Sequence, residues 1–371
     1  MENSSKKQEI LVLLDNKKMI FNLYKTIISL SIEFFLSSFC LLIITNVNAQ
    51  DSHFSQADKL NMYFNPASTG FYDAFYKATA LYRQQWTNIG KGFTTIFASF
   101  DAPIYDKRKQ RNKAGLGGFF YSDIAGDSKF KTTQICLSSS GIVPISKHHF
   151  LAGGIQISYI QKSYDLSSIQ WVNQYNGKKY DASINPMETI TNPFTSFLDV
   201  SIGVKYEYHS TEQTFDTKSF QLFSFDAALF HITQPILQYT PLTEEIQKNR
   251  FVLQSQYLHD FENNKLGIHF YALFMQQAKF HQWMTMALLR IRMKQESQIT
   301  GLLNYSILST GIIFRSTGFI IPNIRFQFSN FEIGLCYDVF FSIYQTLPKG
   351  MNAFEIQLTY SKQRNSLRNL K

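Results

Sequence analysis

After residue 50 the chain lacks any run of about eighteen apolar residues, the length that a membrane-spanning helix requires. It has only three cysteines, which limits it to one intramolecular disulfide. The patterns GxSxG, GxxxxGK[ST] and HExxH are also missing. Nothing in the sequence therefore argues for helical membrane spans, for a nucleophile elbow, for a phosphate-binding loop or for a zinc protease.

The sequence supports neither nucleic-acid binding nor a metal site. The net charge of +9 lies mostly in turns and loops, without a basic helix or a zinc-ligand spacing, which argues against nucleic acid as a partner. Anionic lipid headgroups or an acidic partner fit this charge better. His148 and His149 stand in a short turn with no carboxylate or thiol beside them, which is typical of a solvated turn. We expect no metal, no cofactor and no enzymatic activity.

The N-terminal 49 residues have the features of a secretory signal peptide. A basic start is followed by an apolar run from Thr26 to Ile44 and by the ending TNVNAQ. We place the cleavage between Ala49 and Gln50, and Met19 is an alternative start that would make residues 1–18 a mis-assigned extension. An uncleaved membrane anchor is the rival interpretation, but Glu33 interrupts the run.

What the remaining chain does have is alternation of apolar and polar side chains. In FLDVSIGVKYEYH, Leu198, Val200 and Ile202 share one face, while Asp199 and Ser201 share the other. The segments FEIGLCYDVFF and AFEIQLTYS alternate in the same way. Because successive side chains of a strand point to opposite faces, these segments are predicted strands with one apolar and one polar side.

Strand length favours a transmembrane barrel over a soluble sandwich. Many segments reach the roughly 9–11 residues that a membrane-crossing strand needs, and 35 Phe with 20 Tyr suit a lipid-facing surface with aromatic girdles. Ionised residues in the middle of strands fit a wet lumen. We expect an antiparallel outer-membrane barrel of 12–14 strands, with 14 favoured because such barrels have even numbers. The thirteen candidate segments, of which 299–315 and 324–340 are long enough to contain a turn, are 76–86, 93–104, 114–124, 130–145, 150–164, 197–209, 219–231, 251–261, 265–277, 281–293, 299–315, 324–340 and 353–361.

These assignments divide the chain into a signal peptide (1–49), a periplasmic N-terminal segment (50–75), a barrel (76–361) and a polar tail (362–371). The long connections 166–195 and 233–248 both follow odd-numbered candidates, so we expect them to face out of the cell and the short turns to face the periplasm. AGLGGFF predicts close backbone approach or lumen lining. Cys136 and Cys336 are predicted to be unpaired, with a disulfide as the alternative.

Short motifs along the mature chain together resemble the PorP/SprF family of type IX secretion system membrane proteins of the Bacteroidetes. They are QDSHFSQ, FNPASTG, YRQQW, TTIFASFDAPI, IQWVNQYNGKKYDA, ALFHITQP, IIFRST and IGLCYDV…GMNAFEIQLTY. The individual motifs are short, and the resemblance rests on their order along nearly the whole mature chain. Two departures are Ser68, where an aromatic usually follows the NPA motif, and the eleven residues after Tyr360.

The resemblance implies an integral outer-membrane protein that helps to secrete or anchor surface proteins such as gliding adhesins. The implied partners are other type IX components on the periplasmic side, a cargo or adhesin with a C-terminal targeting domain, and outer-membrane lipid. The motif positions, with a structural or partner-contact role, are Asn65, Pro66, Gly70, Arg83, Gln84, Trp86, Tyr337, Asp338 and Glu355. We expect Asn65-Pro66 to form a turn against the periplasmic mouth, and Arg83 and Trp86 to lie near an aromatic girdle. The alternatives are a porin or apolar-solute transporter and, less supported, an outer-membrane enzyme.

Overall fold

The structure is a computed structural model of the chain. It describes residues 53–87, 92–106, 108, 111–126, 128–165, 171–185, 187, 193–210, 220–240, 243–261, 265–294, 306–341 and 352–363. All of these belong to one compact unit, Ala49–Lys371. The predicted signal peptide, its Ala49–Gln50 cleavage site and residues 364–371 lie outside the described residues.

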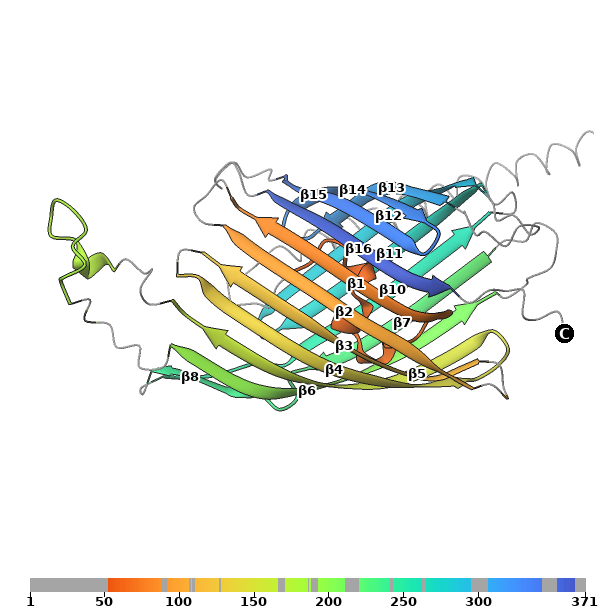
Figure 1. Cartoon of the computed structure of the whole chain (residues 1–371), viewed down its shortest axis with the longest axis horizontal. Coiled ribbons are helices and arrows are strands. Elements are labelled where there is room, and N and C mark those ends of the chain that lie inside the picture. Colours follow the sequence, from red (N-terminus) through yellow and green to blue (C-terminus); the bar gives the residue numbers. More distant parts are fainter. Residues whose placement is uncertain are drawn as a thin grey trace, which may run out of the picture. The chain divides into compact units, whose positions relative to one another are not determined.

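In the described part of the chain, fourteen antiparallel strands close into a barrel, as the sequence predicts (Figure 1). The barrel strands are β1 (Ala74–Gln85), β2 (Phe93–Asp106), β3 (Arg111–Ala125), β4 (Phe130–Pro144), β5 (His149–Ser163), β6 (Phe194–His209), β7 (Phe220–Phe230), β10 (Arg250–Asp260), β11 (Leu266–Gln277), β12 (Phe280–Lys294), β13 (Ser306–Arg315), β14 (Phe319–Phe328), β15 (Phe331–Phe340) and β16 (Ala353–Gln363). Each strand pairs with its neighbour in the chain, and β1 pairs with β16 to close the sheet.

A smaller hairpin, β8 (Ile236–Thr240) with β9 (Thr243–Ile246), lies in the connection between β7 and β10. The candidate segment 324–340 does contain a turn, at residues 329–330, and separates into β14 and β15. The strand β16 runs to Gln363, so the predicted tail begins two residues too early. No helix among the described residues is long and apolar enough to cross a membrane.

The predicted two-faced strands are confirmed by the burial of alternate side chains. On β6, Asp199, Ser201 and Lys205 are buried, whereas Leu198 and Val204 are more than half exposed on the outer face. The outer face is apolar because the hydrocarbon of a membrane, unlike water, does not penalise exposed aliphatic and aromatic side chains. Closure of the sheet satisfies the backbone hydrogen bonds that an open edge would leave unmade in lipid.

The lumen contains residues 53–73, here named the lumen segment, drawn in red and orange inside the strands in Figure 1. Its three short helices are η1 (Ala57–Lys59), α2 (Asn61–Phe64) and η2 (Pro66–Ser68). A fourth short helix, η4 (Val172–Gln174), lies in the connection between β5 and β6. The side chains of Phe54, Leu60 and Phe64 are almost completely buried.

The rings of the lumen segment pack on the inner wall of the barrel. The ring centroid of Tyr63 lies 5.9 Å from that of Phe97 on β2 and 5.7 Å from that of Phe119 on β3. Burial of such rings provides an apolar core inside the barrel. The prediction of a periplasmic segment at residues 50–75 therefore needs correction, because residues 53–73 pack inside the lumen and β1 already begins at Ala74.

Candidate functional site

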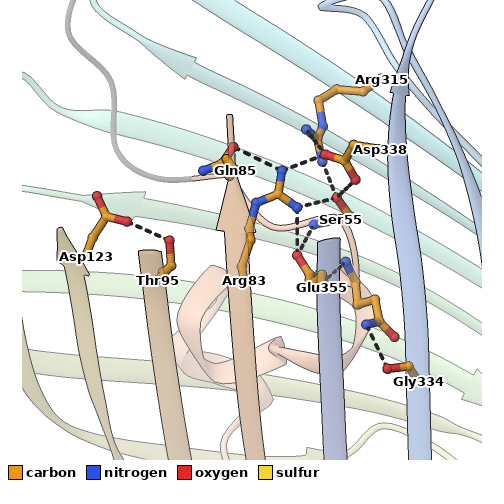
Figure 2. Close-up of polar contacts among 10 residues, drawn as sticks. Ser55, Arg83, Gln85, Thr95, Asp123, Arg315, Gly334, Asp338 and Glu355 are labelled. Atoms are coloured by element: carbon orange, nitrogen blue, oxygen red, sulfur yellow. Dashed lines mark hydrogen bonds and ion pairs between the residues drawn. The ribbon is translucent and has the colours of Figure 1, made fainter. Parts of the chain in front are cut away.

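The lumen segment is attached to the barrel by a buried group of five side chains, named here the Arg83 cluster: Ser55, Arg83, Arg315, Asp338 and Glu355 (Figure 2). The carboxylate of Glu355 accepts hydrogen bonds from the backbone N–H of Ser55 at 2.9 Å and from that of Gln56 at 2.7 Å. The hydroxyl of Ser55 donates to Asp338 Oδ1 at 2.7 Å. The start of the lumen segment is thus bound by two strands, β15 and β16.

Two arginines complete the cluster. Arg83 Nη2 lies 2.6 Å from Asp338 Oδ2, and Arg83 Nη1 lies 2.9 Å from Glu355 Oε2. Arg315 Nη1 lies 3.0 Å from Asp338 Oδ2. Both guanidinium groups also donate to Ser55 Oγ, at 2.7 and 2.6 Å, so this hydroxyl donates one hydrogen bond and accepts two, its full capacity.

The charges of the Arg83 cluster balance within the barrel wall. Two guanidinium and two carboxylate groups meet where each side chain is at most 4% exposed. The desolvation of such groups is costly unless every one is paired and hydrogen-bonded. Removal of one member leaves an uncompensated buried charge, which typically costs about 3–5 kcal/mol. The Arg83 cluster therefore stabilises the closed barrel only when all of its members are present.

Two further ionic contacts hold the next part of the lumen segment, the short helix η1. Asp58 on η1 binds the guanidinium of Arg325 on β14, with Oδ1 2.7 Å from Nη2. Lys59 Nζ lies 2.7 Å from Glu332 Oε1 on β15. Burial alone would raise the pKa of the Asp58 carboxyl, but the Arg325 guanidinium more than offsets this and holds that pKa well below its ordinary value.

Polar contacts attach the second half of the lumen segment to the opposite wall. Asn65 Oδ1 accepts from the backbone N–H of Ala67 at 2.9 Å, and its Nδ2 donates to Val204 O on β6 at 2.9 Å. The hydroxyls of Thr69 and Ser138 lie 2.6 Å apart. Asn65 thus caps η2, where Pro66 occupies the first position, and ties it to the wall.

Glycines on the inner wall permit this close packing. A Cβ on Gly115 of β3 would lie 2.0 Å from Thr69 O, and one on Gly154 of β5 would lie 2.3 Å from the backbone N of Ala67. No larger residue fits at either position unless the backbone of the lumen segment moves. The predicted close backbone approach in AGLGGFF is therefore what Gly115 provides.

The structure brings together three of the motif residues that the sequence treats separately. Arg83, Asp338 and Glu355 meet in one cluster, and the side chain of Arg83 is buried on the lumen side of β1. Asn65, Pro66 and Gly70 all lie in the lumen segment. They contact the inner wall of the barrel, as Asn65 does through Val204 O on β6.

The remaining motif residues lie elsewhere. Gln84 and Tyr337 point outward from their strands. Trp86 follows the end of β1 with a φ of 57°, and its ring centroid lies 4.8 Å from that of Phe93. Cys136 and Cys336 are both unpaired and buried, as predicted.

Sequence reasoning did not assign roles to Ser55, Asp58, Arg315 or Arg325. The signal for the arginines is a single charge at a lumen-facing position of an otherwise apolar strand, as in IIFRST. Among the described residues, no group of three or more His, Cys, Asp or Glu side chains is arranged to hold a metal ion. The buried, mutually paired groups of the Arg83 cluster are suited to holding the lumen segment in place.

Comparisons with known proteins give one family. Residues 46–360 match the model of a family described as type IX secretion system membrane protein PorP/SprF. No curated protein matches the chain.

Several solved structures are similar to this chain at low identity. The toluene transporter TbuX of Ralstonia pickettii is 8% identical, with 82% of this chain and 93% of that chain covered and a TM-score of 0.42. A FadL homologue of Pseudomonas aeruginosa is 10% identical, with 82% and 94% covered and a TM-score of 0.40. BamA of Haemophilus ducreyi lacking POTRA domains 1–3 is 9% identical, with 77% and 70% covered and a TM-score of 0.37.

Proposed function

Because the chain belongs to the PorP/SprF family of type IX secretion system membrane proteins, we propose that it helps to secrete or anchor surface proteins, gliding adhesins among them, without catalysing a reaction. It is an integral outer-membrane protein whose barrel presents an apolar outer face. Its cargo carries a C-terminal targeting domain, and its other partners are type IX components in the periplasm.

The occupied lumen is the observation that carries this proposal. The lumen segment contacts β2 and β3 through its rings, β6 through Asn65, and β14, β15 and β16 through ionic and polar contacts. A diffusion pore needs a continuous water-filled path, whereas a protein that acts by binding its partners does not. Because the lumen is occupied by this segment, we infer that the protein acts through the loops and turns at the two ends of its barrel.

The attachment of the lumen segment makes its release costly. Withdrawal would leave the carboxylates of Asp338 and Glu355 without Ser55, and would separate Asp58 from Arg325. Each broken buried pair costs about 3–5 kcal/mol when one partner is lost. We therefore propose that the segment remains in the lumen while cargo is handled, and that cargo does not pass through this barrel.

The two ends of the barrel have different roles in this proposal. The connections that join β5 to β6 and β7 to β10 are the two long ones that the sequence predicts to face out. They suit contact with a surface protein. The opposite end, where β4 joins β5 and β14 joins β15 by short turns, suits contact with periplasmic components.

The experiment that tests the proposal compares surface and secreted proteins of the native cell with and without this gene. Loss of one or a few large surface proteins, restored by a plasmid copy, supports a dedicated partner. Loss of many secreted proteins supports a general secretion component. An unchanged set of surface and secreted proteins would contradict the proposal.

A further inference from the structure

Basic residues gather at one corner of the short-turn end of the barrel, beside the seam between the first and last strands. The turn between β2 and β3 reads DKRKQRNK (106–113) with its flanks, and the chain continues from the end of β16 as KQRNSLRNLK (362–371). The first stretch holds five cations and one carboxylate, and the second holds four cations and no carboxylate. Only β1 separates β16 from β2 in the closed sheet (Figure 1).

Four of these cations have side chains that the structure describes. They are named here the corner cations: Arg108, Arg111, Lys113 and Lys362. Arg108, Lys113 and Lys362 are exposed, and Arg111 is half-buried. The residues of both stretches that the structure does not describe are either uncharged or basic, so they can only add positive charge.

Few carboxylates oppose this charge. Asp106 lies in the turn itself, and Asp73 precedes β1. The neighbouring short turns contribute none, because they read ISKHH (145–149) and SN (329–330). Inside the wall nearby, Glu332 already pairs with Lys59. The corner is therefore basic whatever positions the undescribed side chains take.

A row of aromatic rings lies next to the corner cations, toward the middle of the barrel. It is named here the seam girdle and consists of Phe331 on β15, Tyr360 on β16, Tyr76 on β1 and Phe100 on β2. Successive ring centroids are 4.8, 5.9 and 5.8 Å apart in that order. Phe331 and Phe100 are 49% and 54% exposed on the outer face. Such a row marks the level at which hydrocarbon gives way to lipid headgroups.

The seam girdle sets the depth of Lys362 in the membrane. Lys362 follows Tyr360 by two residues, so it lies on the same outer face of β16, about 7 Å further along the strand. In a strand tilted by about 40°, this places it about 5 Å beyond the rings. The headgroup layer on each side of a bilayer is about 5–7 Å thick. The charge of Lys362 is thus at the level of the lipid phosphates.

The other three corner cations lie at the same end of β2 and β3. Arg111 is the cross-strand partner of Asp106. The carboxylate of Asp106 accepts a hydrogen bond from the backbone N–H of Arg108 at 2.9 Å and so helps to shape the turn. A register shift makes Lys113 the extra residue of a bulge on β3, and a bulge re-aims the side chains at the end of a strand.

We propose that the corner cations bind the headgroup phosphates of anionic phospholipids in the periplasmic leaflet of the outer membrane. Cations beside a membrane span attract anionic lipid, and each strengthens binding about fivefold. Lipid is favoured over an acidic protein because Lys362 shares its face with the aromatic rings and meets the headgroup layer. The site would hold the seam between β1 and β16 at the membrane surface. This inference goes beyond the proposed function and uses only the predicted orientation, in which the short turns face the periplasm.

The first test is native mass spectrometry of the full-length barrel in a nonionic detergent, with dioleoylphosphatidylglycerol or dioleoylphosphatidylcholine added. The unaltered barrel should bind the anionic lipid about tenfold more tightly than the zwitterionic one. The variant Arg108→Gln/Arg111→Gln/Lys113→Gln/Lys362→Gln should lose this preference and keep its folded band in unheated gel electrophoresis. An unchanged preference in this variant would overturn the inference.

The matched control makes the same change of charge near the other end of the barrel. It replaces four exposed lysines: Lys131→Gln/Lys178→Gln/Lys179→Gln/Lys279→Gln. This variant should keep the preference for the anionic lipid. An equal loss in both variants would show that net charge, and not the corner, attracts the lipid, and would also overturn the inference.

A second measurement examines the rival occupant. A fluorescein-labelled hexaglutamate peptide is titrated against the barrel in zwitterionic nanodiscs, and its anisotropy is recorded. We expect equally weak binding to the unaltered barrel and to the variant that lacks the corner cations. Tight binding that only the unaltered barrel shows, together with an equal lipid preference in the two proteins, would make the corner a site for an acidic protein.

A labelling experiment on whole cells tests which leaflet is involved. A maleimide that does not cross the outer membrane should label Arg108→Cys only after the membrane is permeabilised, whereas Lys178→Cys, in the connection between β5 and β6, should react in intact cells. Labelling of Arg108→Cys in intact cells would overturn the assignment to the periplasmic leaflet. Neither result depends on whether deletion of the gene changes the surface proteins.

Discussion

Arg83 and Glu355 are direct cross-strand partners at the seam where the first and last barrel strands meet, and their side chains form an ion pair inside the lumen. Both also bind Ser55, so the lumen segment spans the seam on its inner side. Closure of the sheet and placement of the lumen segment are therefore coupled through one buried charge cluster.

Replacement of Arg83 by methionine removes one cation from the Arg83 cluster and leaves Glu355 without its ion-pair partner. We expect the barrel to lose about 3–5 kcal/mol of stability. The temperature at which the folded band disappears in unheated gel electrophoresis measures this loss. The control is Gln84→Met, one residue away on the outer face, which should move that temperature little. Equal shifts in both variants would contradict a special role for the cluster.

Gly154→Ala places a Cβ against the backbone of the lumen segment, whereas Gly153→Ala does not, because nothing lies within 4 Å of that position. The first substitution should displace residues near Ala67 and make the segment more accessible. We expect faster cleavage of the lumen segment by added protease in Gly154→Ala than in Gly153→Ala, which should behave as the unaltered protein does. Resistance to cleavage in both variants would show that the wall does not need a glycine there.

The contact between Asp58 and Arg325 gives a defined dependence on acid. Because the pKa of Asp58 is lower in the folded protein than its ordinary value near 3.9, its contribution is complete above about pH 4 and is lost as the pH falls through the folded pKa. Stability measured in urea should thus show this contribution at pH 7 and at pH 5 alike, and lose it only in stronger acid. Asp58→Asn should lose less stability than the unaltered protein between about pH 4 and pH 2. An equal loss would contradict the assignment.

Cys136 and Cys336 test the packing of the inner wall. Both thiols are free, and their exposed fractions are 1% and 3%. A maleimide reagent should label neither thiol in the folded barrel and both after denaturation, since burial denies the reagent access. Mass spectrometry of the labelled protein reads the result. Labelling of Cys336 in the folded state would show that the neighbourhood of Asp338 is open to solvent.

The sequence predicts the barrel well because its strands carry their pattern locally. Leu198 and Asp199 already show which face of β6 meets lipid and which meets the lumen, and the same period recurs in the other strands. The number of strands follows from counting such segments once the turn at residues 329–330 divides the candidate segment 324–340 into two.

The lumen segment could not be predicted in this way. Its short helices have no long apolar period, and its anchor joins Ser55 to Glu355 across 300 residues of sequence. Arg83 and Glu355 could be noticed as separate motif residues, but their contact depends on the register of the seam between β1 and β16. Long-range register of this kind is set by the closed barrel as a whole and not by either segment alone.

The central claim is that the barrel works with the lumen segment in place, and a cross-link tests it most directly. The hydroxyls of Thr69 and Ser138 lie 2.6 Å apart, so cysteines at these two positions are close enough to form a disulfide between the segment and β4. In a strain that carries Thr69→Cys/Ser138→Cys, we expect oxidised barrels to deliver surface proteins as well as the unaltered barrel and either single variant do. Loss of delivery on oxidation, with recovery on reduction, would contradict the account and show that the lumen segment must leave its site.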